Sequence, residues 1–207
     1  GIANGQEVTL KQLMQTVVRN EEVKILPEHF EKTYFHWIDN LLDWCISRQL
    51  WYGHRVPAWY HETCQAVDGR GQSGYFQPAA VGVLEVDNSG FVLCAQCNER
   101  DEKDRFLQDP DTLDTWFSAG LFSFSPLGWP HDNAPDVVAY HPTRVLETGY
   151  DILFFWVARM IMMSTYLLGE VPFRTVYLHG LVRDEQGRKM SKSLDNIIDP
   201  LDVANKF

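Results

Sequence analysis

The sequence is poor in cysteine, has a deficit of basic residues and contains no long uninterrupted apolar run. Its 207 residues include four cysteines, too few for a secreted disulfide scaffold of this length. The 18 lysines and arginines against 28 aspartates and glutamates give a net charge of −10, which excludes a general attraction to nucleic acid or anionic membranes. Arg159 interrupts the longest apolar run, residues 152–168, which favours a buried helix over a membrane span. Because no export signal opens the sequence, we expect a soluble, cytoplasmic protein.

The composition is that of a folded protein, with 45% apolar and 22% charged residues. Apolar spacing and turn signals predict helices over residues 8–19, 28–47 and 151–168, and strands over residues 23–26, 137–146 and 174–179. An Asp-Pro pair at Asp199 predicts a further helix start. Outside a central glycine-punctuated stretch, this alternation predicts an α/β fold with a parallel sheet. We interpret an aromatic stripe in the second helix as core packing; it comprises Phe30, Tyr34, Trp37, Leu41 and Trp44.

The central stretch predicts a small inserted module with its own fold. We expect three parts: residues 1–60, the module at residues 61–110, and residues 111–207. Within the module, Cys94-x-x-Cys97 has metal-ligand spacing, and His61-x-x-Cys64 lies upstream. Three thiolates and one imidazole could hold a tetrahedral structural Zn²⁺. The alternative is a set of reduced thiols without metal.

The one dense positive cluster lies near the C-terminal end and contains Arg183, Arg188, Lys189 and Lys192. A loop with two lysines suits the charge of a triphosphate or a pyrophosphate leaving group. By composition alone, a solvated basic turn is the favoured interpretation.

The string Lys189-Met190-Ser191-Lys192-Ser193 resembles the signature of class I aminoacyl-tRNA synthetases. The flanks are similar to the valyl-tRNA synthetases in particular, over residues 31–37, 43–51, 114–118, 127–130, 148–151, 154–160 and 176–184. The resemblance implies the second, C-terminal half of a Rossmann-like nucleotide-binding domain with a small inserted module that could bind zinc. It also implies activation of valine with ATP and Mg²⁺, and transfer of valine to tRNA(Val).

The resemblance assigns roles to individual residues. Lys189 and Lys192 would stabilise the pyrophosphate side of the transition state. The implied ATP contacts are Gly149, Asp151, His179, Gly180, Met190, Ser191 and Ser193. Tyr52 and Trp156 would wall the valine pocket. From the residues alone, Trp156 could be plain core, Asp151 a helix N-terminal residue and His179 a structural histidine.

The sequence departs from this family in three ways. Tyr52 stands where a tryptophan is usual, and Asp195 stands where glycine is usual. The His-Ile-Gly-His signature of the first half of the catalytic domain does not occur in the 207 residues. We therefore expect a fragment that is inactive or nearly so alone, with an exposed sheet edge and apolar face where a missing N-terminal half would dock. The alternative is a stand-alone, non-catalytic module that binds a nucleotide or a protein.

Overall fold

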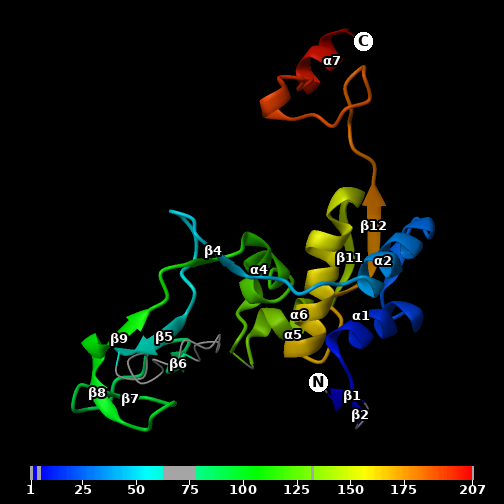
Figure 1. Cartoon of the computed structure of the whole chain (residues 1–207). Helices are drawn as coiled ribbons and strands as arrows, with labels where there is room; N and C mark the ends of the chain where they lie inside the picture. The colour runs from blue at the N-terminus through cyan, green and yellow to red at the C-terminus, as the bar shows by residue number, and fades with distance from the viewer. Residues whose placement is uncertain (1, 4–5, 63–77, 132, 207) are drawn as a thin grey trace. The chain divides into compact units, whose positions relative to one another are not determined.

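The computed structural model describes residues 2–3, 6–62, 78–131 and 133–206 of the chain (Figure 1). The chain divides into two compact units. The first, here called the sheet unit, comprises Gly1–Asp43 and Ser118–Phe207. The second, the insert unit, comprises Trp44–Phe117 and is wider on both sides than the expected module at residues 61–110.

The sheet unit is built on a three-stranded parallel sheet. Strand β12 (Phe173–His179) lies between β11 (Thr143–Gly149) and β3 (Lys24–Leu26). In this register Gly149 lies opposite His179. The parallel α/β architecture expected from the alternation of elements is therefore confirmed.

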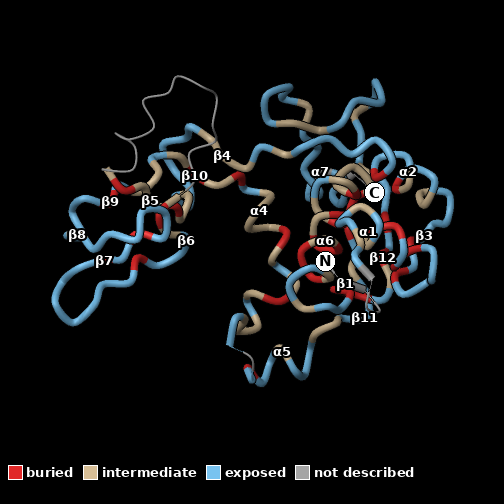
Figure 2. Tube along the Cα trace, turned by 60° about the horizontal axis from the view of Figure 1, so that its bottom comes forward, coloured by how far each residue is buried: buried red, intermediate tan, exposed pale blue. Residues whose placement is uncertain are grey.

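Three α-helices contribute buried side chains to the main core. They are α1 (Leu10–Arg19), α2 (His29–Asp39) and α6 (Arg159–Leu167). Figure 2 shows the buried segments concentrated where α1 and α6 meet the strands of this unit. Tyr34 is buried among them and donates a 3.0 Å hydrogen bond to the carbonyl of Met14, and burial raises the pKa of its hydroxyl. The apolar residues of the cluster include Val17, Val23, Ile25, Ile38, Val157, Ile161, Phe173 and Val176.

The two faces of the sheet differ in burial. Side chains alternate between faces along a strand, so the buried Ile25 and Val176 lie on the face opposite Leu26 and Tyr177. On that opposite face Val145, Tyr177 and Leu26 are 60%, 51% and 38% exposed. Parallel sheets are normally covered on both faces. Among the described residues this second face is therefore open at these three positions, whereas Phe173, the first residue of β12, lies on the same side and is buried.

The predicted helix over residues 28–47 is wrong beyond Asp39, where α2 ends. The side chain of Asn40 donates a 2.8 Å hydrogen bond to the carbonyl of His36, and Lys11 donates one of 2.6 Å to the carbonyl of Asp39. The Lys11 contact satisfies a carbonyl that another helical turn would have used, and the Asn40 side chain adds a second donor to the carbonyl that its own amide already bonds. Trp44 then bonds Asp114 in the insert unit, so the supposed aromatic stripe does not continue to it on one helix face.

The interval between residues 135 and 168 also differs from expectation. Pro135 starts a helix, α5 (Pro135–Tyr140), which overlaps the start of the strand predicted over residues 137–146. Proline is favoured in the first helical turn because its missing N–H and fixed φ cost nothing there. The segment expected as one helix from residue 151 begins instead as η3 (Tyr150–Ile152) and a π-helical stretch, η4 (Leu153–Ala158), before α6.

The insert unit consists of short antiparallel strands. Strand β5 (Ala58–His61) pairs with β6 (Ala80–Val81) and with β9 (Phe106–Gln108). The other pairs are β7 (Phe91–Leu93) with β8 (Arg100–Glu102), and β4 (Ser47–Arg48) with β10 (Thr112–Leu113). The small core of this unit comprises Ala79, Leu84, Val92, Cys94 and Phe106.

The remaining elements are short. They are β1 (Ile2–Ala3), β2 (Gln6–Glu7), η1 (Lys103–Arg105), α4 (Thr115–Gly120), η2 (Ser125–Leu127), η5 (Lys192–Leu194) and α7 (Pro200–Lys206). The predicted helix start is confirmed, since the Asp199 carboxylate accepts a 2.8 Å bond from the amide of Leu201. Among the described helices, none combines the length and apolar character that a bilayer span requires.

Candidate functional site

The carboxyl ends of β11 and β12 bring three of the predicted nucleotide-binding residues together. Gly149 ends β11, and a Cβ added to it would lie 2.7 Å from Oδ1 of Asp151 and 3.7 Å from Cε1 of His179. Only a residue without a side chain fits there unless Asp151 moves. The close approach explains why glycine occupies this strand end.

The lysine loop, residues 188–193, returns to these strand ends. Nζ of Lys189 lies 2.5 Å from Oδ2 of Asp151. Arg183, which precedes the loop, donates a 2.6 Å hydrogen bond to the hydroxyl of Tyr150. A residue expected to contact ATP and a residue expected to stabilise the pyrophosphate are thus in direct contact with each other.

The rest of the loop is ordered by its own small side chains. The Ser191 hydroxyl accepts a 3.2 Å bond from the amide of Ser193 and lies 2.7 Å from the Ser193 hydroxyl, at the start of η5. The sulfur of Met190 accepts a hydrogen bond from the amide of Ile198. Within the described residues Lys192 forms no ion pair, and it is exposed, so its ammonium group can meet an anion.

Two further acidic side chains at this end of the sheet were missed by sequence reasoning. Glu147 on β11 lies 3.5 Å from Nε2 of His179, on the neighbouring strand. Asp184 accepts hydrogen bonds from the side chain of Asn196 and from Arg188, and these donors lower the pKa of Asp184 to about 2. An aspartate at the start of a glycine-containing turn was the available signal for Asp184.

The two predicted valine-pocket residues belong to different units. Trp156, on η4, is half-buried and donates a 3.0 Å hydrogen bond to the carbonyl of Ala119, with the Phe122 ring 6.2 Å away. Tyr52, in the insert unit, is 92% exposed. The pairing of these two residues as pocket walls stays a prediction. Gly180, predicted to contact ATP, has open space around the position of a Cβ.

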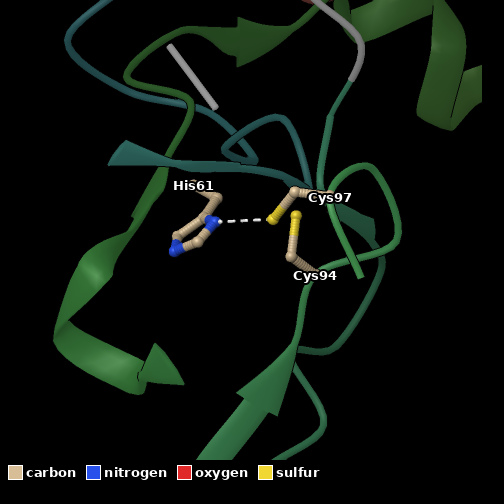
Figure 3. Close-up of side chains that lie close together, drawn as sticks. All are labelled: His61, Cys94 and Cys97. Carbon is tan, nitrogen blue, oxygen red and sulfur yellow. Dashed lines mark hydrogen bonds between the residues drawn. The ribbon is translucent and has the colours of Figure 1, made fainter. Parts of the chain in front are cut away.

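A group of metal-ligating side chains lies in the insert unit. One ligand atom each from His61, Cys94 and Cys97 falls within 4.8 Å of the others, and Nδ1 of His61 is 3.4 Å from the sulfur of Cys97 (Figure 3). His61 and Cys94 are buried, at the end of β5 and directly after β7. Cys64, the fourth predicted ligand, lies outside the described residues.

The surroundings of His61 suit a ligand role. Its second ring nitrogen, Nε2, lies 3.2 Å from Oδ2 of Asp101, and its ring stacks on Phe106 at 4.6 Å. A carboxylate on the second nitrogen fixes the tautomer and ring orientation of a ligating histidine. The amide of Glu102 and the ring of His61 lower the pKa of Asp101, which keeps this carboxylate ionised. Two thiols and one oriented imidazole are a donor set that zinc accepts.

Comparison with known proteins gives one family throughout. The profile described as tRNA synthetases class I (I, L, M and V) matches residues 7–207. The chain is 49% identical to a valine–tRNA ligase of Symbiobacterium thermophilum over 203 residues, which are 97% of this chain and 20% of that protein. It is 52% identical to valine–tRNA ligase, chloroplastic/mitochondrial 2, of Arabidopsis thaliana, over 92% of this chain and 18% of that protein. The chain therefore spans about a fifth of the length of these relatives.

The solved structures agree at the level of the fold. Methionyl-tRNA synthetase of Mycobacterium tuberculosis in complex with methionyl-adenylate matches with a TM-score of 0.56 and 19% identity, over 96% of this chain and 29% of that one. A ternary complex of Agrobacterium radiobacter K84 LeuRS with tRNA and LeuAMS matches with a TM-score of 0.51 and 25% identity, over 86% of this chain and 25% of that one.

Proposed function

Because the chain belongs to the class I tRNA synthetases (I, L, M and V), we propose that it supplies the lysine loop and part of the nucleotide site of a valine–tRNA ligase. In the proposed reaction the carboxylate of valine attacks the α-phosphorus of ATP, giving valyl-adenylate and pyrophosphate. The valyl group is then transferred to the terminal ribose of tRNA(Val), releasing AMP. Identity near 50% to valine–tRNA ligases supports valine as the amino acid.

One observation carries the proposal: the lysine loop lies against the carboxyl ends of the parallel strands, through Lys189 and Asp151. Ligands of open parallel sheets bind at this edge. Lys189 and Lys192 would face the departing pyrophosphate and stabilise the negative charge that develops on it. Asp151 and the backbone of Gly149 would hold the ribose, and His179 with Gly180 would lie against the adenosine. Mg²⁺ would accompany the triphosphate as its counterion.

Selection of the amino acid would depend on Trp156 and Tyr52. Large rings leave room for a short branched side chain and exclude longer ones sterically. The hydrogen bond from the Trp156 indole to Ala119 supports a fixed position for that ring.

A structural Zn²⁺ in the insert unit is part of the proposal. His61, Cys94 and Cys97 would hold it, with Cys64 as the expected fourth ligand, and the closed ligand set leaves it no catalytic position. The zinc ion would cross-link the short strands of the insert unit. Free thiolate ligands are maintained in a reducing compartment, which supports a cytoplasmic location.

The test is valine-dependent ATP–pyrophosphate exchange, measured with the chain alone and with the chain mixed with a matching N-terminal half of the catalytic domain. We expect exchange only in the mixture and a loss of about 100-fold or more when Lys192 is changed to alanine. Lys32→Ala, an exposed lysine on α2, is the matched control. The proposal is wrong if the folded mixture shows no exchange, or if isoleucine or leucine supports it better than valine.

A second candidate, a non-catalytic nucleotide- or protein-binding module, is favoured by Asp195 and by the open sheet face. Asp195 has a φ of +48°, a left-handed conformation that suits the glycine usual there. ATP binding without exchange in the mixture would support this second function.

A further inference from the structure

The lysine loop is closed at its base by two side chains outside the lysine motif. Nδ2 of Asn196 donates a 2.8 Å hydrogen bond to Oδ2 of Asp184. These two residues lie on either side of the loop, before Lys189 and after Ser193. The contact, here called the Asp184–Asn196 bridge, therefore joins the incoming and outgoing chain.

The Asp184 carboxylate is fully used as an acceptor. Its Oδ1 accepts the backbone amides of Arg188 at 2.7 Å and Gln186 at 3.1 Å, and its Oδ2 accepts Nε of Arg188 at 2.8 Å as well as Asn196. Its side chain is only 8% exposed in an otherwise exposed loop. A carboxylate with four donors cannot be replaced by an amide without turning an N–H toward other donors.

Asn196 extends this network to the motif itself. Its Oδ1 accepts a 2.8 Å bond from the amide of Ser191, and its Nδ2 lies 3.3 Å from the carbonyl of Lys189. The backbone is thus held on both sides of Met190. Asn196 therefore holds the backbone at Lys189 and at Ser191, the residue that precedes Lys192.

We propose that the Asp184–Asn196 bridge positions the lysine loop for the pyrophosphate group, a role that rests on the proposed function of that loop. Asp184 and Asn196 are positioning residues that act through Lys189 and Lys192. Lysine side chains are long and flexible, and an ordered backbone lowers the entropy lost when both meet one anion.

A positioning role of the bridge and a purely electrostatic role predict changes of opposite sign in the affinity for pyrophosphate. Asp184→Asn and Glu185→Gln each remove one negative charge from neighbouring positions, and Glu185 is exposed. Coulomb's law alone predicts tighter binding of an anion in both variants. Positioning predicts that Asp184→Asn binds inorganic pyrophosphate about tenfold more weakly, because a charged hydrogen-bond network is broken. Glu185→Gln should bind within about twofold of the unaltered chain.

The measurement is calorimetric titration of the 207-residue chain with pyrophosphate, accompanied by thermal unfolding and by hydrogen exchange of residues 186–196. The double change Asp184→Asn/Asn196→Asp reverses donor and acceptor and should recover part of the lost affinity and of the amide protection. Unchanged or tighter binding in Asp184→Asn would overturn the proposal, as would equal weakening in Glu185→Gln or no recovery in the double variant. Failure of the proposed function is distinguishable, because that function is tested by valine-dependent exchange in the mixture, whereas the bridge is tested by the pyrophosphate affinity of the variants relative to the unaltered chain. Absence of pyrophosphate binding by the unaltered chain would overturn the bridge proposal alone.

Discussion

Different interactions stabilise the interior of each unit. The sheet unit has two seven-residue strands, β11 and β12, and one large apolar cluster that includes Phe173, Val176 and Ile161. In the insert unit the strands are two to four residues long, and polar contacts such as Arg48 with Asp114 and Arg100 with Asp87 join them. Apolar burial stabilises without precise geometry, whereas polar and ligand contacts stabilise only when every partner is placed. The stability of the insert unit should therefore depend more on bound metal and on pH than the stability of the sheet unit does.

Removal of metal should give the largest effect and should destabilise only one of the two units. We expect a strong chelator, or Cys94→Ser, to unfold the insert unit and to leave the sheet unit folded, since metal binding energy acts as folding energy in small metal-bound modules. Hydrogen exchange at Val92 and Phe106, compared with Val176, measures this difference. Cys45→Ser, at an exposed cysteine, is the control. Equal loss of protection in both units, or no bound zinc in the purified chain, would contradict the expectation.

Truncation of a side chain in the main core should destabilise the sheet unit and leave the insert unit folded. Phe173→Ala removes a side chain that is 1% exposed and should cost about 3–5 kcal/mol of sheet-unit stability. Chemical denaturation followed by hydrogen exchange at Val176 and Val92 would show whether the loss stays in one unit. Phe122→Ala, an exposed aromatic of the same unit, should cost far less. A similar cost for both substitutions would show that burial does not dominate here.

Acid should weaken the insert unit through Asp87. The amides of Phe91 and Ser89 and the guanidinium of Arg100 lower the pKa of this carboxyl. A depressed folded pKa means that its contribution is present above the unfolded value, near 4, and is lost as pH falls through the folded value. We expect the zinc-bound chain to lose insert-unit protection as the pH falls below about 4, and Asp87→Asn to lose less of it than the unaltered chain. Asp104→Asn in η1 is the control, and an equal acid response in Asp87→Asn would point to another group.

The smallest expected effect concerns the stability of the lysine loop. This part of the sheet unit is held by polar contacts, as the insert unit is. Asp195→Gly should stabilise this loop by about 0.5–1 kcal/mol, because glycine adopts a φ of +48° without the penalty of a side chain. Hydrogen exchange of residues 191–198 measures the gain. Asn98→Gly, also at a positive φ but in the insert unit, offers a matched comparison. A loss of protection in Asp195→Gly would mean that the side chain of Asp195 stabilises the loop.

Regular patterns predicted the parts of the fold that depend on local chemistry. The helical spacing before Arg19, the extended run into His179 and the Asp-Pro pair at Asp199 all have their cause within a few residues, and the structure agrees at each. The end of α2 and the start of α5 were missed. At the end of α2, Lys11 contacts the last carbonyl from a distant part of the sequence, and at α5 a single proline outweighs two β-branched neighbours.

The candidate site divides in the same way. The motif residues could be predicted from a contiguous string, and the Cys94-x-x-Cys97 spacing directed attention to His61, which the fold brings within reach. Asp184 and Asn196 could not be found this way, because their contact exists only after the loop has closed. Glu147 likewise meets His179 only through the pairing of two strands that are far apart in sequence.

The contact between Lys189 and Asp151 has a consequence for the ionic strength at which the site works. The protein itself supplies the counterion of one lysine, so fewer dissolved anions gather there. In the proposed function, binding of ATP would exchange one partner of Lys189 for another and release little bound salt. The affinity for nucleotide should consequently depend on potassium chloride concentration less steeply than two lysines would suggest, with Lys192 responsible for most of the slope.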